Sequence, residues 1–80
     1  MARCRAEFTI EPFAEGHPGP HVVAAVAAAR EAGLNPEVGP FGTSITGTPD
    51  AILGGLGRVI EGSLAAGASR ISVQLTVLAE

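Results

Sequence analysis

The chain has no lysine, tryptophan or tyrosine, and its 80 residues include only three phenylalanines and one cysteine. Its five arginines are scattered, and eight acidic residues bring the net charge to −3. A protein that binds nucleic acid or an anionic lipid surface needs clustered basic charge, and an RNA-binding sheet needs exposed aromatic rings. The composition therefore argues against nucleic acid as a partner and favours a small cation.

Other absences limit the possible sites and the compartment. Cys4 is the single cysteine, so the chain cannot form an internal disulfide or a cysteine metal cage. No apolar run approaches the roughly 18 residues that a membrane span requires, and the N-terminus lacks the hydrophobic region of a signal peptide. We expect a cytoplasmic protein with no membrane partner and no metal.

The length predicts one domain, residues 1–80. A folded chain of this size buries only about 60% of the surface that its unfolded form exposes, so a monomer has marginal stability. Self-association would bury more surface. We therefore expect a homo-oligomer, either a dimer or a homotetramer.

Four segments have the pattern of β-strands. Residues 4–10 and 70–78 alternate between apolar and polar side chains, as half-buried strands do. The segment 35–40 contains two prolines, which cannot donate ladder hydrogen bonds, so it belongs at a sheet edge. A tight connection joins it to residues 42–47, and this spacing predicts an antiparallel hairpin.

Two segments have the boundary signals of helices. The alanine-rich run 22–32 follows Pro20 and ends at Gly33. Residues 48–50, Thr-Pro-Asp, supply an N-cap hydroxyl, a first-turn proline and a first-turn acid for a second helix that ends at Gly67. The glycines inside this helix predict that it approaches the sheet closely. Its predicted inner stripe consists of Ile52, Leu56, Ile60, Ser63 and Leu64.

The element order, βαββαβ with two right-handed crossovers, predicts an α+β ferredoxin-like fold. In this fold a four-stranded antiparallel sheet carries both helices on one face. The predicted core on the covered face includes Phe8, Ile10, Ile45, Val73 and Leu75. Strand alternation places these residues on the uncovered face: Glu7, Thr9, Glu11, Glu37, Ser44, Thr46, Ser72, Gln74 and Thr76.

The uncovered face allows three interpretations from its pattern alone. It is a solvated surface, a surface that packs on another subunit, or a polar pocket in which carboxylates meet a cation or an amino group. An enzyme is not expected. Glu7 and Glu11 lie roughly 13 Å apart along one strand, too far to share a proton, and no nucleophile has an evident base beside it.

Three segments resemble the thiamine-binding protein family that includes the YkoF-like proteins: "FTIEPFAEG", "EAGLNPEVGPFGTSITGTPD" and "GASRISVQLTV". The resemblance covers essentially the whole chain. It implies non-enzymatic binding of thiamine or its hydroxymethylpyrimidine part, with no required cofactor, by a carrier or sensor that forms dimers or tetramers through its sheet. The alternative is an oligomeric structural or interaction protein whose small-molecule ligand is lost or different.

At matching positions, the resemblance makes Thr9 and Thr43 the leading ligand contacts, with Gly42 and Ser44 beside them. Thr46 is also included in the predicted binding site, at a position where the family commonly has Glu. Structural roles are the alternatives for both leading residues. Thr43 also suits the start of a strand, and Thr9 also suits a hydrogen bond across a dimer interface.

The chemistry of thiamine agrees with this set of side chains. Its neutral aminopyrimidine has an amino donor and ring-nitrogen acceptors, which hydroxyl groups can satisfy. Its thiazolium is cationic, so Glu11, Glu37 or Glu7 is a candidate to neutralise it, and Phe41 is a candidate to pack on a ring. A turn residue covering the edge of the core is the alternative for Phe41.

Overall fold

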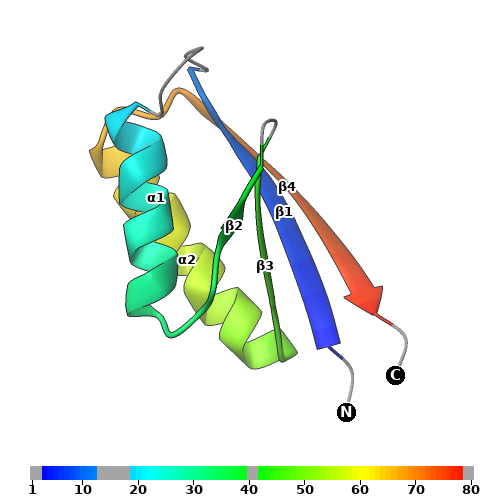
Figure 1. Ribbon diagram of the computed structural model, residues 1–80. Helices are drawn as coiled ribbons and strands as arrows, with labels where there is room; N and C mark the ends of the chain where they lie inside the picture. Colours follow the sequence, from blue (N-terminus) through cyan, green and yellow to red (C-terminus); the bar gives the residue numbers. More distant parts are fainter. Residues whose placement is uncertain (1–2, 13–18, 40–41, 79–80) are drawn as a thin grey trace.

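The computed structural model describes residues 3–12, 19–39 and 42–78. The strands are β1 (Arg3–Glu11), β2 (Glu37–Val38), β3 (Thr43–Gly47) and β4 (Arg70–Leu78), and the helices are α1 (Pro20–Glu31) and α2 (Pro49–Ala65). The strands form one antiparallel sheet in the order β2-β3-β1-β4. Both helices cover the same face of this sheet (Figure 1). The predicted α+β ferredoxin-like fold is confirmed.

The helices begin and end where the sequence signals lie. The hydroxyl oxygen of Thr48 accepts a hydrogen bond of 3.3 Å from the backbone N–H of Ala51, and Pro49 follows in the first turn. Gly33 and Gly67 have φ angles of 83° and 100°, a conformation that favours glycine and stops each helix. Within the described ranges, neither helix is long and apolar enough to cross a membrane.

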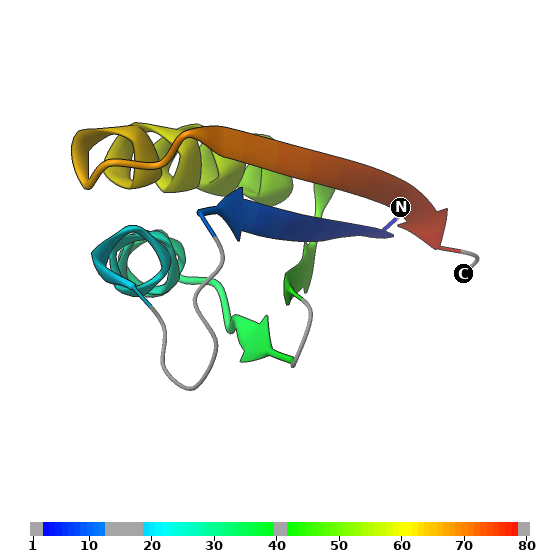
Figure 2. The ribbon, with the colours of Figure 1, turned by 90° about the horizontal axis from the view of Figure 1, so that it is seen from above.

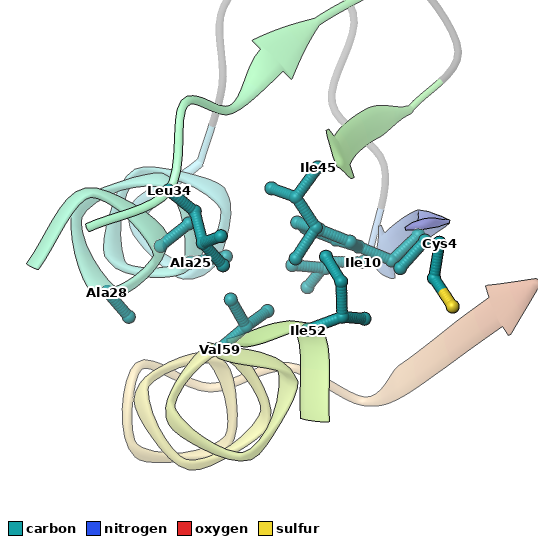
Figure 3. Close-up of a cluster of buried hydrophobic side chains, with 11 residues drawn as sticks. Cys4, Ile10, Ala25, Ala28, Leu34, Ile45, Ile52 and Val59 are labelled. Atoms are coloured by element: carbon teal, nitrogen blue, oxygen red, sulfur yellow. The ribbon is translucent and has the colours of Figure 1, made fainter. Parts of the chain in front are cut away.

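A compact set of aliphatic side chains fills the space between the sheet and the helices. Ile45 of β3 and Ile52 and Val59 of α2 are almost completely inaccessible to solvent and lie near one another (Figure 3). Phe8 and Ile10 extend this cluster along β1, as predicted. Burial of such side chains is the main stabilising contribution in a domain of this size.

The predicted inner stripe of α2 is partly wrong. The buried positions are Ile52, Gly55, Val59 and Ser63, whereas Ile60 and Leu64 are exposed. The glycines explain the difference, because they bring α2 close to α1 rather than to the sheet. A Cβ atom at Gly62 would lie 3.7 Å from that of Ala28 in α1. This close approach turns the larger side chains of α2 away from α1.

The predicted core is also wrong at β4. Val73 and Leu75 pair with Phe8 and Ala6, so they do lie on the helix-facing side of the sheet. Their exposed fractions are nevertheless 43% and 51%. The reason is the position of β4 at the edge: α2 packs over β1 and β3, and α1 over β1. In the view of Figure 2 the C-terminal half of β4 extends past the end of the helix layer.

Candidate ligand-binding site on the open sheet face

The open face is the side of the sheet opposite the helices. Residues that lie directly opposite one another on neighbouring strands share a face, so the register tells which side chains meet there. Glu37 of β2 is opposite Ser44 of β3, and Ser44 is opposite Glu7 of β1. Glu7 is in turn opposite Gln74 of β4. These four residues form one line across all four strands, which we call the carboxylate row.

A hollow of about 720 Å³ lies over this part of the sheet. Its lining corresponds to three successive lines of paired residues. The first is the carboxylate row, the second runs Val38, Thr43, Phe8 and Val73, and the third contains Gly39, Gly42, Thr9 and Ser72. Because side chains alternate between the faces, the first and third lines direct side chains to the open face. The middle line supplies the backbone floor between them.

The glycines of the third line keep one end of the hollow open. The N–H of Gly39 donates a 2.8 Å hydrogen bond to the carbonyl oxygen of Gly42. A Cβ atom at Gly42 would lie 3.0 Å from the carbonyl oxygen of Phe8 and 3.2 Å from the methyl carbon of Thr9. The backbone at Gly42, just before β3, therefore lies so close to β1 that a side chain there would have to displace its neighbours.

The charge of the hollow comes from carboxylates. Among the described residues that line it, Glu7 and Glu37 are the charged ones, and both are exposed. They stand two strands apart, about 10 Å between their backbones, with Ser44 between them. This arrangement suits a small cation or an amino-substituted ring placed over Ser44. Within the described residues no group of three or more His, Cys, Asp or Glu side chains is placed to hold a metal ion.

Comparison with known proteins decides the family. Residues 6–79 match the family model described as thiamine-binding protein. The chain belongs to the thiamine-binding protein family. The resemblance seen in the sequence is thus confirmed over nearly the whole chain. No curated protein sequence matches this member of the family significantly.

Solved structures confirm the fold of this thiamine-binding-family chain. A domain of unknown function, DUF77, from Bacillus cereus has 22% identity and a TM-score of 0.70, covering 98% of this chain and 76% of that one. A candidate thiamine biosynthesis/salvage protein from Thermotoga maritima has 18% identity and a TM-score of 0.68, covering 98% of this chain and 84% of that one. At these identities the likeness establishes the shared fold.

The structure brings most of the site residues predicted from the sequence together. Thr9, Glu37, Gly42, Thr43 and Ser44 all line the hollow. Four of the five belong to the lines whose side chains reach the open face.

Thr43 is the exception among the five. It is only 6% exposed and is opposite Phe8, so its side chain shares the helix-facing side with the core. On this geometry its backbone, rather than its hydroxyl group, borders the open face.

Three other predicted site residues are not in the described part of the hollow. Glu11 lies farther along β1, where its Oε2 atom is 3.6 Å from Nε of Arg70. Thr46 is on the open face but two lines beyond the carboxylate row, opposite Arg5. Phe41 lies outside the described residues.

The hollow also includes Ser72 and Gln74, which the predicted site lacked. It includes Glu7 as well, which the sequence offered only as one of three alternatives for neutralising the thiazolium. Alternation in the sequence already placed them on the open face. The missing information was the strand register, which puts Glu7 and Gln74 in line with Ser44 and Glu37 rather than one or two residues away.

Proposed function

We propose that this protein is a cytoplasmic carrier or sensor that binds thiamine, or the hydroxymethylpyrimidine part of thiamine, in the hollow on its open face without changing it chemically. The observation that supports this function is the carboxylate row. Two carboxylates flank a hydroxyl group at the centre of a hollow with no basic lining residue among those described. Membership of the thiamine-binding protein family supports the choice of ligand.

The two parts of thiamine match different groups of the row. A carboxylate accepts hydrogen bonds only, so Glu7 or Glu37 suits the exocyclic amino group or the cationic ring. Ser44 and Gln74 can both donate and accept, which suits the ring nitrogens of the pyrimidine. In this proposal no group acts as a nucleophile or transfers a proton, and no further cofactor is required.

Isothermal titration calorimetry with thiamine, hydroxymethylpyrimidine and thiamine diphosphate tests the proposal. Thiamine should bind, and thiamine diphosphate should bind more weakly because its phosphates meet two carboxylates. Absence of heat with thiamine and with hydroxymethylpyrimidine, for protein whose folding is verified by circular dichroism, would overturn it.

Adjacent residues on opposite faces provide a matched test of the location. Ser44→Ala removes a hydroxyl from the open face, and Thr43→Val removes one from the helix-facing side. Loss of one ligand hydrogen bond costs about 1 kcal/mol, or roughly fivefold in Kd. We expect this loss for Ser44→Ala and little change for Thr43→Val. The reverse result would indicate that the ligand binds on the helix-facing side of the sheet.

A second candidate function is an oligomeric interaction protein without this ligand. The exposed apolar side chains of β4 and α2 favour self-association independently of the hollow. Calorimetry separates the two functions, because the second one predicts an intact oligomer that binds none of the three compounds.

A further inference from the structure

Two arginines border the hollow on the open face, one beyond each end. Arg70 lies beyond the glycine end, opposite Glu11, and its Nε atom is 3.6 Å from Oε2 of that carboxylate. Arg5 lies beyond the other end, two lines past the carboxylate row, and it is opposite Thr46 on β3 and Thr76 on β4. A carboxylate therefore faces one of these arginines, whereas hydroxyl groups face the other on both sides.

The residues around Arg5 have the groups that bind an anion. We call Arg5, Thr46 and Thr76 the arginine line. A guanidinium group presents N–H donors in a fork that matches phosphate oxygens, and a threonine hydroxyl can donate a further hydrogen bond. Neighbouring strands are about 5 Å apart, so a phosphate above Arg5 is within reach of a hydroxyl on either side. All three side chains are at least partly exposed, so a ligand can reach them.

The spacing between the arginine line and the carboxylate row suits a dipolar ligand. Arg5 and Glu7 are two residues apart on β1 and share the open face. Side chains in this relation stand about 7 Å apart. Opposite charges at this spacing attract the two ends of a ligand that has both a cation and an anion. They also orient it, since the reverse orientation would bring like charges together.

The extent of the hollow gives the direction of the ligand. The hollow runs from the carboxylate row toward Gly39, Gly42 and Thr9, and its described lining does not include the arginine line. A ring therefore fits on the glycine side, and only a thin arm lies over the arginine line. In thiamine the pyrimidine and the hydroxyethyl arm are attached to opposite sides of the thiazolium ring. With the thiazolium over Ser44, the pyrimidine occupies the glycine side and the arm points to Arg5.

We propose that the arginine line is a phosphate subsite through which the protein binds the monophosphate ester of thiamine in this orientation. The inference rests on the proposed function, because the carboxylate row holds the cationic ring of the same ligand. Arg5 donates charge-assisted hydrogen bonds to the phosphate, and the hydroxyl groups of Thr46 and Thr76 donate to its remaining oxygen atoms.

The subsite distinguishes one phosphate from two. Arg5 is the single charged residue of the arginine line, so it offsets part of the charge of one phosphate. A second phosphate adds repulsion from Glu7 and Glu37. Arg3, two residues farther along β1, is opposite Leu78 and so has no hydroxyl group facing it from β4. Thiamine monophosphate should therefore bind more tightly than thiamine diphosphate.

Paired titrations of thiamine and thiamine monophosphate test the subsite. Arg5→Gln should weaken monophosphate binding about fivefold, the upper range for an exposed charged contact. The same substitution should leave thiamine binding unchanged or make it slightly tighter, because it removes a positive charge near the cationic ring. The ratio of the monophosphate Kd to the thiamine Kd should therefore rise. Arg58→Gln is the matched control, since Arg58 is an exposed arginine on α2, and it should leave this ratio unchanged.

The other bordering arginine tests the orientation. Arg70→Gln should leave the ratio of the two Kd values nearly unchanged, because Arg70 lies at the pyrimidine end and beside Glu11. A ratio that responds to Arg70→Gln rather than to Arg5→Gln would overturn the subsite by placing the phosphate at the opposite end. Thiamine binding with a ratio unaffected by Arg5→Gln would overturn the subsite and leave the proposed function standing. Absence of binding by both compounds would overturn the two together.

Discussion

Neutralising one carboxylate of the carboxylate row should weaken the binding of a cationic ligand and leave the binding of a neutral ligand nearly unchanged. A cation over Ser44 lies one strand spacing, about 5 Å, from Glu7 on one side and from Glu37 on the other. At this distance the Coulomb attraction is about 0.8 kcal/mol in water and about 3 kcal/mol at an effective dielectric constant of 20. Both side chains are exposed, so screening favours the lower value. Glu7→Gln and Glu37→Gln should each weaken thiamine binding about fourfold.

The comparison between ligands makes this experiment specific. Hydroxymethylpyrimidine has no permanent charge, so the same substitutions should change its Kd by less than about twofold when titrated in the same buffer. Raising the salt concentration should weaken thiamine binding to the wild type. The difference in Kd for thiamine between the wild type and the variants should therefore become smaller. Glu61→Gln, an exposed acid on α2, is the control for net charge.

Two outcomes would refute the electrostatic argument. In the first, thiamine and hydroxymethylpyrimidine lose affinity equally in Glu7→Gln, which means that the carboxylate acts as a hydrogen-bond acceptor for the pyrimidine. In the second, Glu61→Gln weakens thiamine binding as much as Glu7→Gln does. This result would mean that the overall charge of the protein, rather than the carboxylate row, attracts the cation.

Three further predictions concern stability and are checked by urea unfolding. Gly54→Ala should stabilise the protein by about 1 kcal/mol, because the new Cβ meets open space. Gly55→Ala should not give this stabilisation, because its Cβ would collide with the buried Leu34. Thr48→Ala should cost about 1 kcal/mol by removing the N-cap hydrogen bond of α2. Ile52→Ala should cost about 2–5 kcal/mol because this side chain is 1% exposed. Equal effects of the two glycine substitutions would contradict the packing of α2 described above.

Local signals in the sequence were sufficient to predict the helices and strands and their order along the chain. Alternation identified β1 and β4, the proline-glycine connection identified the hairpin of β2 and β3, and residues 48–50 marked the start of α2. Each signal depends on neighbouring residues only. The antiparallel order then follows because few topologies join such elements with short, right-handed connections.

Packing between elements was less predictable, and α2 shows why. A hydrophobic stripe identifies an inner face by its large side chains, so it missed Gly55, which is buried because the helix backbone itself makes the contact. The same reasoning assigned Val73 and Leu75 to the core. Alternation gives the face of a strand on which a side chain lies, but it does not tell whether a second layer covers that part of the strand.

The site needed information of another kind. Four of its open-face members, Thr9, Glu37, Gly42 and Ser44, were named from the sequence, but whether Glu7 or Glu11 joins them depends on register. A shift of four residues along β1 would put Glu11 in the place of Glu7 without altering which face the two carboxylates occupy. The tight contact of Gly42 with Phe8 and the pairing of β1 with β4 hold the observed register.

The alternation of β4 separates two surfaces with different surroundings. Residues 72, 74 and 76 are polar and face the open side, and residues 71, 73, 75 and 77 are aliphatic and lie on the helix-facing side. Ser72 and Gln74 line the hollow, so the polar set contributes directly to the proposed site. Val73, Leu75 and Val77 remain exposed because β4 lies at the edge of the sheet, where the helices leave it largely uncovered. Sequence alternation alone gives the same pattern for both sets, and only the arrangement of the helices distinguishes a core strand from this edge.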